Sequence, residues 1–459
     1  MEILKKLFAP VDMTTGKPWE RIVAFMIPML IGNIAQQLYN TVDSIVVGKY
    51  VGDNALAAVG SAGPILNLLI VLFVGISMGA GIVVSQFLGA KKREELSRTL
   101  GSCIFLTAVA SVFVMVVASL VAKPLLVLLK TPDTIIEWCN SYLIILFLGA
   151  AGMAYYNILS GILRGLGDSV AALLYLVVAS LLNIVLDLLF VAKFGMGVNG
   201  VALATVIAQI VSALLCLRRL GKLKDMLDLK REYVRWDSKY CMEIIRLGLP
   251  TGITQAIMSM SMLVVQTLTN SFGEMFIAAN VIVMRVDGFA MMPAFSFGTA
   301  MTTFAGQNVG ARMMDRVHKG AKQGTMIAMG VSVTITLSIL LVGRYLMAIF
   351  TNTPELVDLS MQMMKILAVG YIAMAVTQCL SGVMRGAGDT VTPMWISIIT
   401  TIVIRVPLAY GMVYLTRSEQ FPKGRQECLY ISLLISWLLS ALFTVISYIR
   451  GKWMSKAIL

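Results

Sequence analysis

The sequence has few charged residues for its length. Only 13% of its 459 residues are charged, while 58% are hydrophobic. A soluble domain carries roughly 25% charged residues, so this composition excludes an ordinary soluble domain and indicates a membrane protein. The polar, basic N-terminus lacks a small-residue cleavage site. We therefore expect the first apolar segment to stay in the bilayer rather than to be removed as a signal peptide.

The sequence also lacks the residues of common catalytic and metal sites. Its single histidine, His318, lies in a basic loop, and its six cysteines have no CxxC spacing. A zinc site and a histidine-based nucleophilic triad are thereby excluded. No GxxxxGK[ST] phosphate loop is present, so ATP does not drive the protein directly. A membrane-embedded enzyme would need such groups at membrane depth, and we predict that the protein is no enzyme and uses no organic cofactor.

One phrase is present twice. LSGILRGLGDS begins at Leu159, and LSGVMRGAGDT begins at Leu380, 221 residues later. Other landmarks keep nearly the same offset, namely Pro28 with Pro250, Gln86 with Gln307, and Gly89 with Gly310. Because several separate landmarks agree on one spacing, the chain is predicted to contain a duplicated half.

Twelve apolar segments are long enough to cross a membrane as helices. Six lie in the first half, at 22–48, 55–88, 99–122, 135–162, 169–192 and 198–217, and six in the second, at 242–271, 276–308, 324–343, 357–384, 391–415 and 428–449. An even number per half gives both halves the same orientation, which is a parallel repeat. We predict an all-α membrane protein with two pseudo-symmetric six-helix lobes, 1–217 and 242–459, joined by a basic linker at 218–241.

Basic residues predict the orientation of these helices. With the N-terminus inside, about 26 Lys and Arg fall on the cytoplasmic side and about 8 outside, as the positive-inside rule requires. Both termini are then cytoplasmic in a multi-pass protein of the cell membrane. The net charge of +13 follows from this topology, so nucleic acid is not expected as a partner, whereas lipid headgroups are.

A few polar groups lie inside the apolar segments, where a charge costs about 2.5–3.5 kcal/mol on insertion scales. Asp43 follows Tyr39 by one helical turn, and Asp187 follows Asn183 by one turn. Counting depth along the helices places both carboxylates and Thr205 in the outer half of the membrane. Asp43, Asn183, Asp187 and Thr205 offer oxygens that could bind Na⁺ as a metal site or share a proton. The alternative is that the carboxylates only fix helix packing.

The second half does not repeat this set. At the same offset, Leu408 stands for Asp187 and Ile404 for Asn183. Because packing alone should act on both copies, the asymmetry favours a functional role in the first half. The second half instead has Arg285, Asp287 and Arg405 inside apolar segments, and these form either a structural or gating pair or a second polar site.

These residues resemble the multidrug and toxic compound extrusion (MATE) transporters. The resemblance rests on TTGKPWERIVAFMIPMLIGN, NTVDSIVVGKYVGDNALAAVG, QFLGAKKREE and the paired RGxGD loops, and it covers nearly the whole chain. It implies two lobes in a V and export of organic, often cationic, compounds in exchange for Na⁺ or H⁺. We expect cationic or amphipathic small-molecule substrates and the lipid bilayer as partners, and a monomeric protein.

Within the family, the first-half set is similar to the ion site of the DinF-like branch. The resemblance implies ion coupling by Asp43, Asn183, Asp187 and Thr205, supporting roles for Tyr39 and Asn157, and a helix bend at Pro28. The carboxylates of the NorM-like branch have no clear match in the second half. A flippase for lipid-linked precursors remains the alternative function. A major-facilitator transporter does not fit the GAKKREEL loop.

Overall fold

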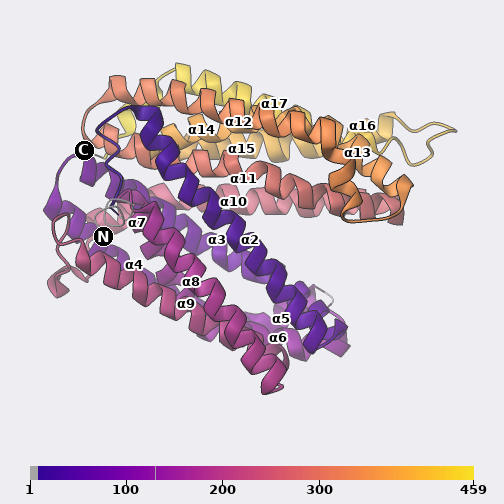
Figure 1. Cartoon of the computed structure of the whole chain (residues 1–459), viewed down its shortest axis with the longest axis horizontal. Coiled ribbons are helices and arrows are strands. Elements are labelled where there is room, and N and C mark those ends of the chain that lie inside the picture. The colour runs from indigo at the N-terminus through magenta and orange to yellow at the C-terminus, as the bar shows by residue number, and fades with distance from the viewer. Residues whose placement is uncertain (1–8, 130, 459) are drawn as a thin grey trace. The chain divides into compact units, whose positions relative to one another are not determined.

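The computed structural model describes residues 9–129 and 131–458, without the side chains of six residues inside helices (Asp43, Ser44, Asp53, Pro64, Leu68 and Leu69). All regular structure in these residues is helical (Figure 1). The α-helices are α2 (Pro18–Tyr50), α3 (Asp53–Gly89), α4 (Arg93–Phe113), α5 (Ser119–Leu128), α6 (Asp133–Leu148), α7 (Ala150–Gly165), α8 (Ser169–Asp187), α9 (Gly197–Lys222), α10 (Ser238–Ser271), α11 (Glu274–Gly310), α12 (Met314–Ala348), α13 (Pro354–Ala368), α14 (Gly370–Gly386), α15 (Val391–Ile398), α16 (Arg405–Leu415) and α17 (Glu427–Ile449).

Short segments of other helix types interrupt or follow these helices. Three are π-helices, η1 (Val114–Ala118), η2 (Leu188–Lys193) and η4 (Ile399–Ile404), and two are 3₁₀-helices, η3 (Arg231–Tyr233) and η5 (Lys452–Lys456). Among the described residues, ten helices are long and apolar enough to cross a membrane, and two bent pairs supply two more spans if each pair crosses once. The predicted all-α fold with twelve spans is confirmed.

The bent pairs were expected as unbroken helices at 135–162 and 357–384. The structure instead bends α6–α7 by 54° and α13–α14 by 44°. Glycine marks both breaks, since a Cβ added to Gly149 or Gly370 would come closer than 3.0 Å to Val206 of α9 or Trp437 of α17, respectively. Glycine weakens a helix by about 1 kcal/mol relative to alanine, and here it allows close packing at the bend. The close approach of a neighbouring helix at each glycine therefore overrides the uniform apolar pattern.

The duplication predicted from the sequence is repeated in the backbone. Gly167 and Gly388 both have positive φ, +86° and +99°. The residue after each closes the same turn, with Asp168 N donating to Leu163 O at 2.8 Å and Asp389 N donating to Met384 O at 2.9 Å. A second pair of turns holds Lys91 and Arg312 at φ 57° and 58°. The two halves are thus copies of one backbone plan.

Contacts divide the chain into two compact units. Unit 1 contains Ile27–Gly252 and short segments from both ends of the chain, whereas unit 2 contains Met13–Met26 and Ile253–Ala457. Helices α2 and α10 therefore each supply residues to both units, and α2 changes unit two residues before Pro28. The lobe limits predicted from the sequence stay a prediction.

Candidate functional site

Helix α8 of unit 1 carries two polar residues on one face. The helix begins after Asp168, whose carboxylate accepts a hydrogen bond from Ala171 N and so caps it. Its sequence is then apolar up to Asn183 and Asp187, which lie one turn apart and are 1% and 0% exposed. The α-helix ends at Asp187, where the π-helix η2 begins. Such π segments are frequent at functional sites.

Asn183 is the centre of a hydrogen-bonded cluster. With its amide oxygen turned toward Thr205 of α9, it accepts from Thr205 N at 2.9 Å and from Thr205 Oγ1 at 3.3 Å. Its amide nitrogen then donates to Asp187 Oδ2 at 2.9 Å and to Tyr39 Oη of α2 at 3.1 Å. The structure therefore brings Tyr39, Asn183, Asp187 and Thr205 together from three helices, as depth counting anticipated.

The side chain of Asp43 lies outside the described residues, so its predicted place in this cluster stays a prediction. Asn157 has other contacts. Its amide nitrogen donates to Met153 O of its own helix at 2.8 Å, and its backbone oxygen accepts from Ser77 Oγ at 2.7 Å. Among the described hydrogen bonds, none joins Asn157 to Asn183 or Asp187. The resemblance placed Asn157 in the supporting network, and the structure gives it a separate site.

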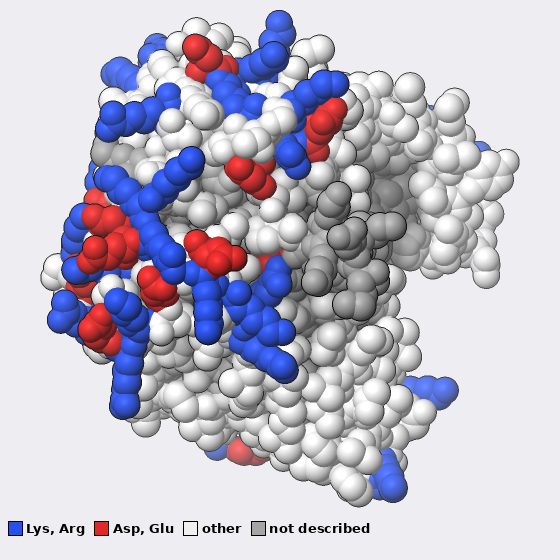
Figure 2. All heavy atoms as spheres, turned by 60° about the vertical axis from the view of Figure 1, so that its left-hand side comes forward, with Lys and Arg blue, Asp and Glu red and all other residues white. Residues whose placement is uncertain are grey.

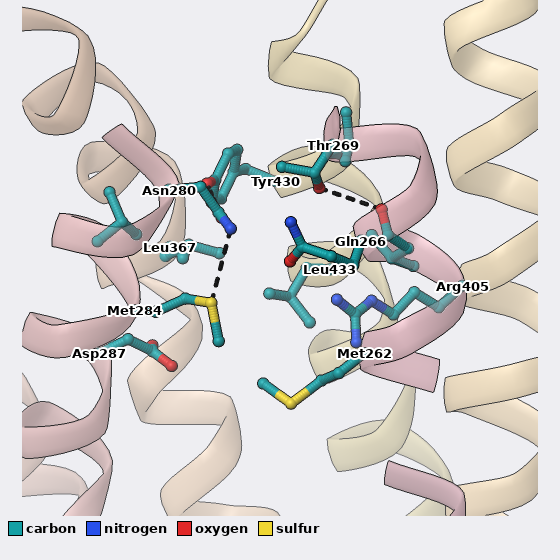
Figure 3. A pocket seen from close by; sticks show the side chains of 13 residues that line it. Met262, Gln266, Thr269, Asn280, Met284, Asp287, Leu367, Arg405, Tyr430 and Leu433 are labelled. Carbon is teal, nitrogen blue, oxygen red and sulfur yellow. Dashed lines mark hydrogen bonds between the residues drawn. The ribbon is translucent and has the colours of Figure 1, made fainter. Parts of the chain in front are cut away.

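Unit 2 has a different polar centre, a pocket of about 80 Å³. Asp287 of α11 and Arg405 of α16 lie on its opposite walls, and their side chains point toward each other (Figure 3). The carboxylate of Asp287 accepts a hydrogen bond from Tyr371 Oη of α14 at 3.0 Å. Two of the three charged residues expected at a second polar site, Asp287 and Arg405, therefore line one pocket.

Arg285 is not part of this pocket. It is exposed and does not line the cavity, although it lies only two residues from Asp287. Residues two apart on a helix face different directions, which explains why a local Arg285–Asp287 pair does not form. Tyr371 was not anticipated, because it lies in a distant part of the sequence and no motif marks it.

The RGxGD loop of unit 1 has a polar role that the sequence did not reveal. Asp168 is 1% exposed and accepts a hydrogen bond from Arg219 Nε of α9 at 2.7 Å. Burial raises the pKa of the Asp168 carboxyl, and the Arg219 guanidinium opposes that shift. In unit 2, Asp389 instead accepts from Thr392 N and Thr392 Oγ1, at 3.1 and 2.7 Å.

In Figure 2, Lys and Arg side chains, with Asp and Glu side chains among them, gather mainly on the left-hand part of the surface in view, and most of the right-hand part is uncharged. The repeated turns contribute to the basic residues of each unit, since Lys91, Lys92 and Arg93 of unit 1 and Arg312 and Lys319 of unit 2 are exposed. Exposed basic residues in connections between apolar helices are the pattern on which the predicted orientation rests.

Comparison with known proteins identifies the family. The MatE family profile matches residues 28–189 and 250–411, more than half of the chain and one match in each half. The chain belongs to the MatE family. It is 30% identical over 408 residues to the probable multidrug resistance protein YoeA of Bacillus subtilis (strain 168), with 87% of this chain and 88% of that protein covered.

Two further relatives agree with this assignment. The probable multidrug resistance protein NorM of Thermotoga maritima is 26% identical, over 96% of this chain and 94% of that protein. A multidrug resistance MATE family transporter of the MOP superfamily, solved in an outward-facing conformation, matches with a TM-score of 0.89 and 25% identity, over 98% of this chain and 99% of that chain. The MatE protein described here is thus a multi-pass membrane transporter and not an enzyme.

Proposed function

We propose that this MatE protein exports organic compounds of varied structure and that an inward gradient of H⁺ or Na⁺ drives export through the carboxylates of unit 1. The names of its relatives, multidrug resistance proteins, support the cargo class. The observation that carries the coupling is the buried Asp187, held by an Asn183 amide that also binds Thr205 and Tyr39. Asp43, four residues after Tyr39, is proposed as the second carboxylate, as in the DinF-like branch.

The chemistry follows from what Asp187 needs in each charge state. As a carboxylate it accepts the Asn183 hydrogen bond, and an acceptor that carries a charge forms a bond roughly twice as strong as a neutral one. When Asp187 is protonated, or when Na⁺ binds to the same oxygens, the carboxylate accepts the Asn183 hydrogen bond less strongly, and the Asn183 amide is released. Because the amide also bonds Tyr39, the charge state of α8 is transmitted to α2. An ion shifts a conformational equilibrium only by its differential affinity for the two states.

Pro28 gives α2 a place to respond. Proline has no backbone N–H, so the helix lacks one bond of its ladder there, and the boundary between the two compact units falls two residues earlier. We propose that loss or gain of the Tyr39–Asn183 bond bends or straightens α2 at Pro28 and so changes the affinity for cargo. We also propose, from the distribution of Lys and Arg under the positive-inside rule, that both termini lie in the cytoplasm of a cell-membrane protein.

The test is export of a dye from vesicles, with a Na⁺ gradient and a pH gradient imposed separately. Asp187→Asn and Asp43→Asn should each abolish the response to the active gradient while the protein still inserts and folds. Asp358→Asn is the matched control, because Asp358 is 52% exposed and pairs with Arg344. Gradient-driven export at the wild-type rate in either site variant would reduce that carboxylate to a packing role.

A further inference from the structure

The pocket in unit 2 contains two opposite charges that do not pair. Among the described residues, the ion pairs within 4.0 Å do not include Asp287 with Arg405. The buried Nε of Arg405 has no hydrogen-bond partner in the part of the chain that the structure describes. A buried charged donor left unsatisfied destabilises the folded protein by more than a neutral one would. The arrangement therefore calls for something between the two groups.

Direct pairing would be the least costly way to hold two charges at this depth. Both residues lie inside apolar spans, α11 and the span Val391–Leu415, where attraction between charges is stronger than in water. Each interacts electrostatically with the other, yet a cavity keeps them apart. The cavity has room for several waters, since one water occupies roughly 10–15 Å³ of this measure. A small polar group would fit equally well.

The local backbone also points to a site at Arg405. The π-helix η4 ends at Ile404, so Arg405 is the first residue of α16. A π segment changes the direction in which the next side chains point, and such segments occur frequently at functional sites. Here the change of helix type coincides with Arg405, the cationic residue among the described residues of the pocket wall.

The rest of the wall combines amides with apolar groups. Tyr430 Oη donates to Asn280 Oδ1 at 2.5 Å, and Asn280 Nδ2 lies 3.6 Å from Met284 Sδ (Figure 3). Met262, Val265 and Leu433 supply apolar surface. Thioether side chains adapt to ligands of different shape. A ligand with a polar head and an apolar body matches these walls.

We propose that this pocket binds the zwitterionic head of a small organic ligand, with its carboxylate at Arg405 and its ammonium group at Asp287. The walls carry one charge of each sign, so a ligand that is dipolar but neutral satisfies both and adds no net charge to the membrane interior. A cationic ligand would pair with Asp287 but place a second positive charge near Arg405. An anionic ligand would pair with Arg405 but place a second negative charge near Asp287. Arg binds carboxylates with two parallel hydrogen bonds, which suits this role.

The inference rests on the proposed function in one respect, namely that the ligand of this pocket is taken to be a transported compound. It concerns equilibrium binding in unit 2, whereas the proposed function concerns coupling in unit 1. Binding measured without any gradient, and repeated in Asp187→Asn, therefore separates the two. Failure of the coupling proposal would appear in transport and leave this binding intact.

The experiment is calorimetric titration of the protein in lipid nanodiscs with three probes of one scaffold. L-phenylalanine is a zwitterion, its methyl ester is a cation, and N-acetyl-L-phenylalanine is an anion. We expect the zwitterion to bind at least about tenfold more tightly than either derivative, because each lacks one charged contact and a tenfold change corresponds to 1.4 kcal/mol. Equal affinity for the zwitterion and the ester, or no binding of the zwitterion, would overturn the proposal. This comparison of three probes uses the wild-type protein alone.

Variants assign the two charges. Arg405→Gln should remove the preference for the zwitterion over the ester, and Asp287→Asn should remove its preference over the N-acetyl derivative. Arg285→Gln removes one charge from the same helix as Asp287 but from outside the pocket, and it should leave all three affinities unchanged. A zwitterion preference that survives in both site variants would place the binding elsewhere.

Discussion

The two units hold their buried polar side chains in different ways. In unit 1, Asn183 connects Asp187, Tyr39 and Thr205 by hydrogen bonds of 2.9–3.3 Å, and the polar groups are in direct contact. In unit 2, Asp287 and Arg405 face each other across a pocket, and Tyr371 donates the one hydrogen bond to the carboxylate that is seen among the described residues. A cluster whose polar groups are in direct contact suits binding and release of a small ion, whereas a pocket between separated charges suits a larger ligand.

The difference arises although the two units share the same backbone turns and the same glycine-mediated close packing of helices, which we call the shared frame. Gly167 and Gly388 have the same kind of turn, and glycine keeps neighbouring helices close in both units. Duplication therefore preserved backbone geometry and left the side chains of the polar centres free to diverge. Substitutions at five positions can break or sharpen this comparison.

The largest effect is expected where the shared frame is tightest. A Cβ on Gly165 would come closer than 3.0 Å to the backbone oxygen of Gly81, and one on Gly386 to that of Thr302. Backbone cannot give way as a side-chain end can, so Gly165→Ala and Gly386→Ala should each prevent accumulation of folded protein. Size-exclusion profiles after membrane extraction measure this. Gly330→Ala, where no atom lies within 4 Å of the added Cβ, is the control. A normal profile for one of the two frame variants would mean that the frame is not shared.

The Asp168–Arg219 ion pair, which has no counterpart at Asp389 in the described part of unit 2, should give the next largest effect. Arg219→Gln leaves the buried Asp168 carboxylate without its cation, and loss of one partner of a buried pair costs about 3–5 kcal/mol. Arg219 is 20% exposed, so we expect the lower figure of about 2–3 kcal/mol, read as a lower melting temperature in detergent. Arg218→Gln, at an exposed neighbouring position, should have no such effect.

The pH dependence of that loss gives a second check. Burial raises the pKa of Asp168, and removal of Arg219 removes the opposing influence, so the pKa rises further. The charged form is then the costly one in the folded state, and the cost is present above the raised pKa. As pH falls through it, the carboxyl is protonated and the melting temperatures of wild type and Arg219→Gln should converge. Divergence in acid would refute the assignment.

Helices, spans and duplication could be predicted because they depend on local pattern and spacing. Asn183 and Asp187 were predictable neighbours, since they are one turn apart, and depth counting brought Thr205 to the same level as Asp187. Tyr39 was predicted only as a neighbour of Asp43 and, from the resemblance, as a supporting residue. The Asp168–Arg219 pair and the Tyr371–Asp287 bond were not, because they depend on which helices pack side by side. The bend before Ala150 was missed because its cause, the approach of Val206, is a tertiary contact.

A smaller effect is expected from the amide that organises unit 1. Asn183→Leu removes the donor that stabilises the ion-free Asp187 carboxylate, and a hydrogen bond to a charged group contributes about 1.5–3 kcal/mol. The ion-bound form is then favoured, so ion affinity should rise at least tenfold and no longer be coupled to the Asn183 amide. Asn157→Leu should change ion affinity little, because Asn157 bonds its own helix. Efflux rates over a series of ion concentrations measure both. The reverse order would return Asn157 to the coupling network.

The smallest effect is expected at the proposed bend. Pro28→Ala restores a backbone donor to α2 and stiffens the helix, so cargo binding should survive while gradient-driven release slows. Stopped-flow release of preloaded dye distinguishes the two steps. Unchanged release kinetics would exclude bending at Pro28 from the transport cycle.

The claim that coupling belongs to unit 1 and not to unit 2 is tested most directly in proteoliposomes that export one permanently cationic dye. The quantity to measure is the ratio of export rates with and without an imposed ion gradient, in wild type, Asp187→Asn and Asp287→Asn. We expect the ratio to fall to one in Asp187→Asn and to keep its wild-type value in Asp287→Asn. A ratio that persists in Asp187→Asn and is lost in Asp287→Asn would contradict the account.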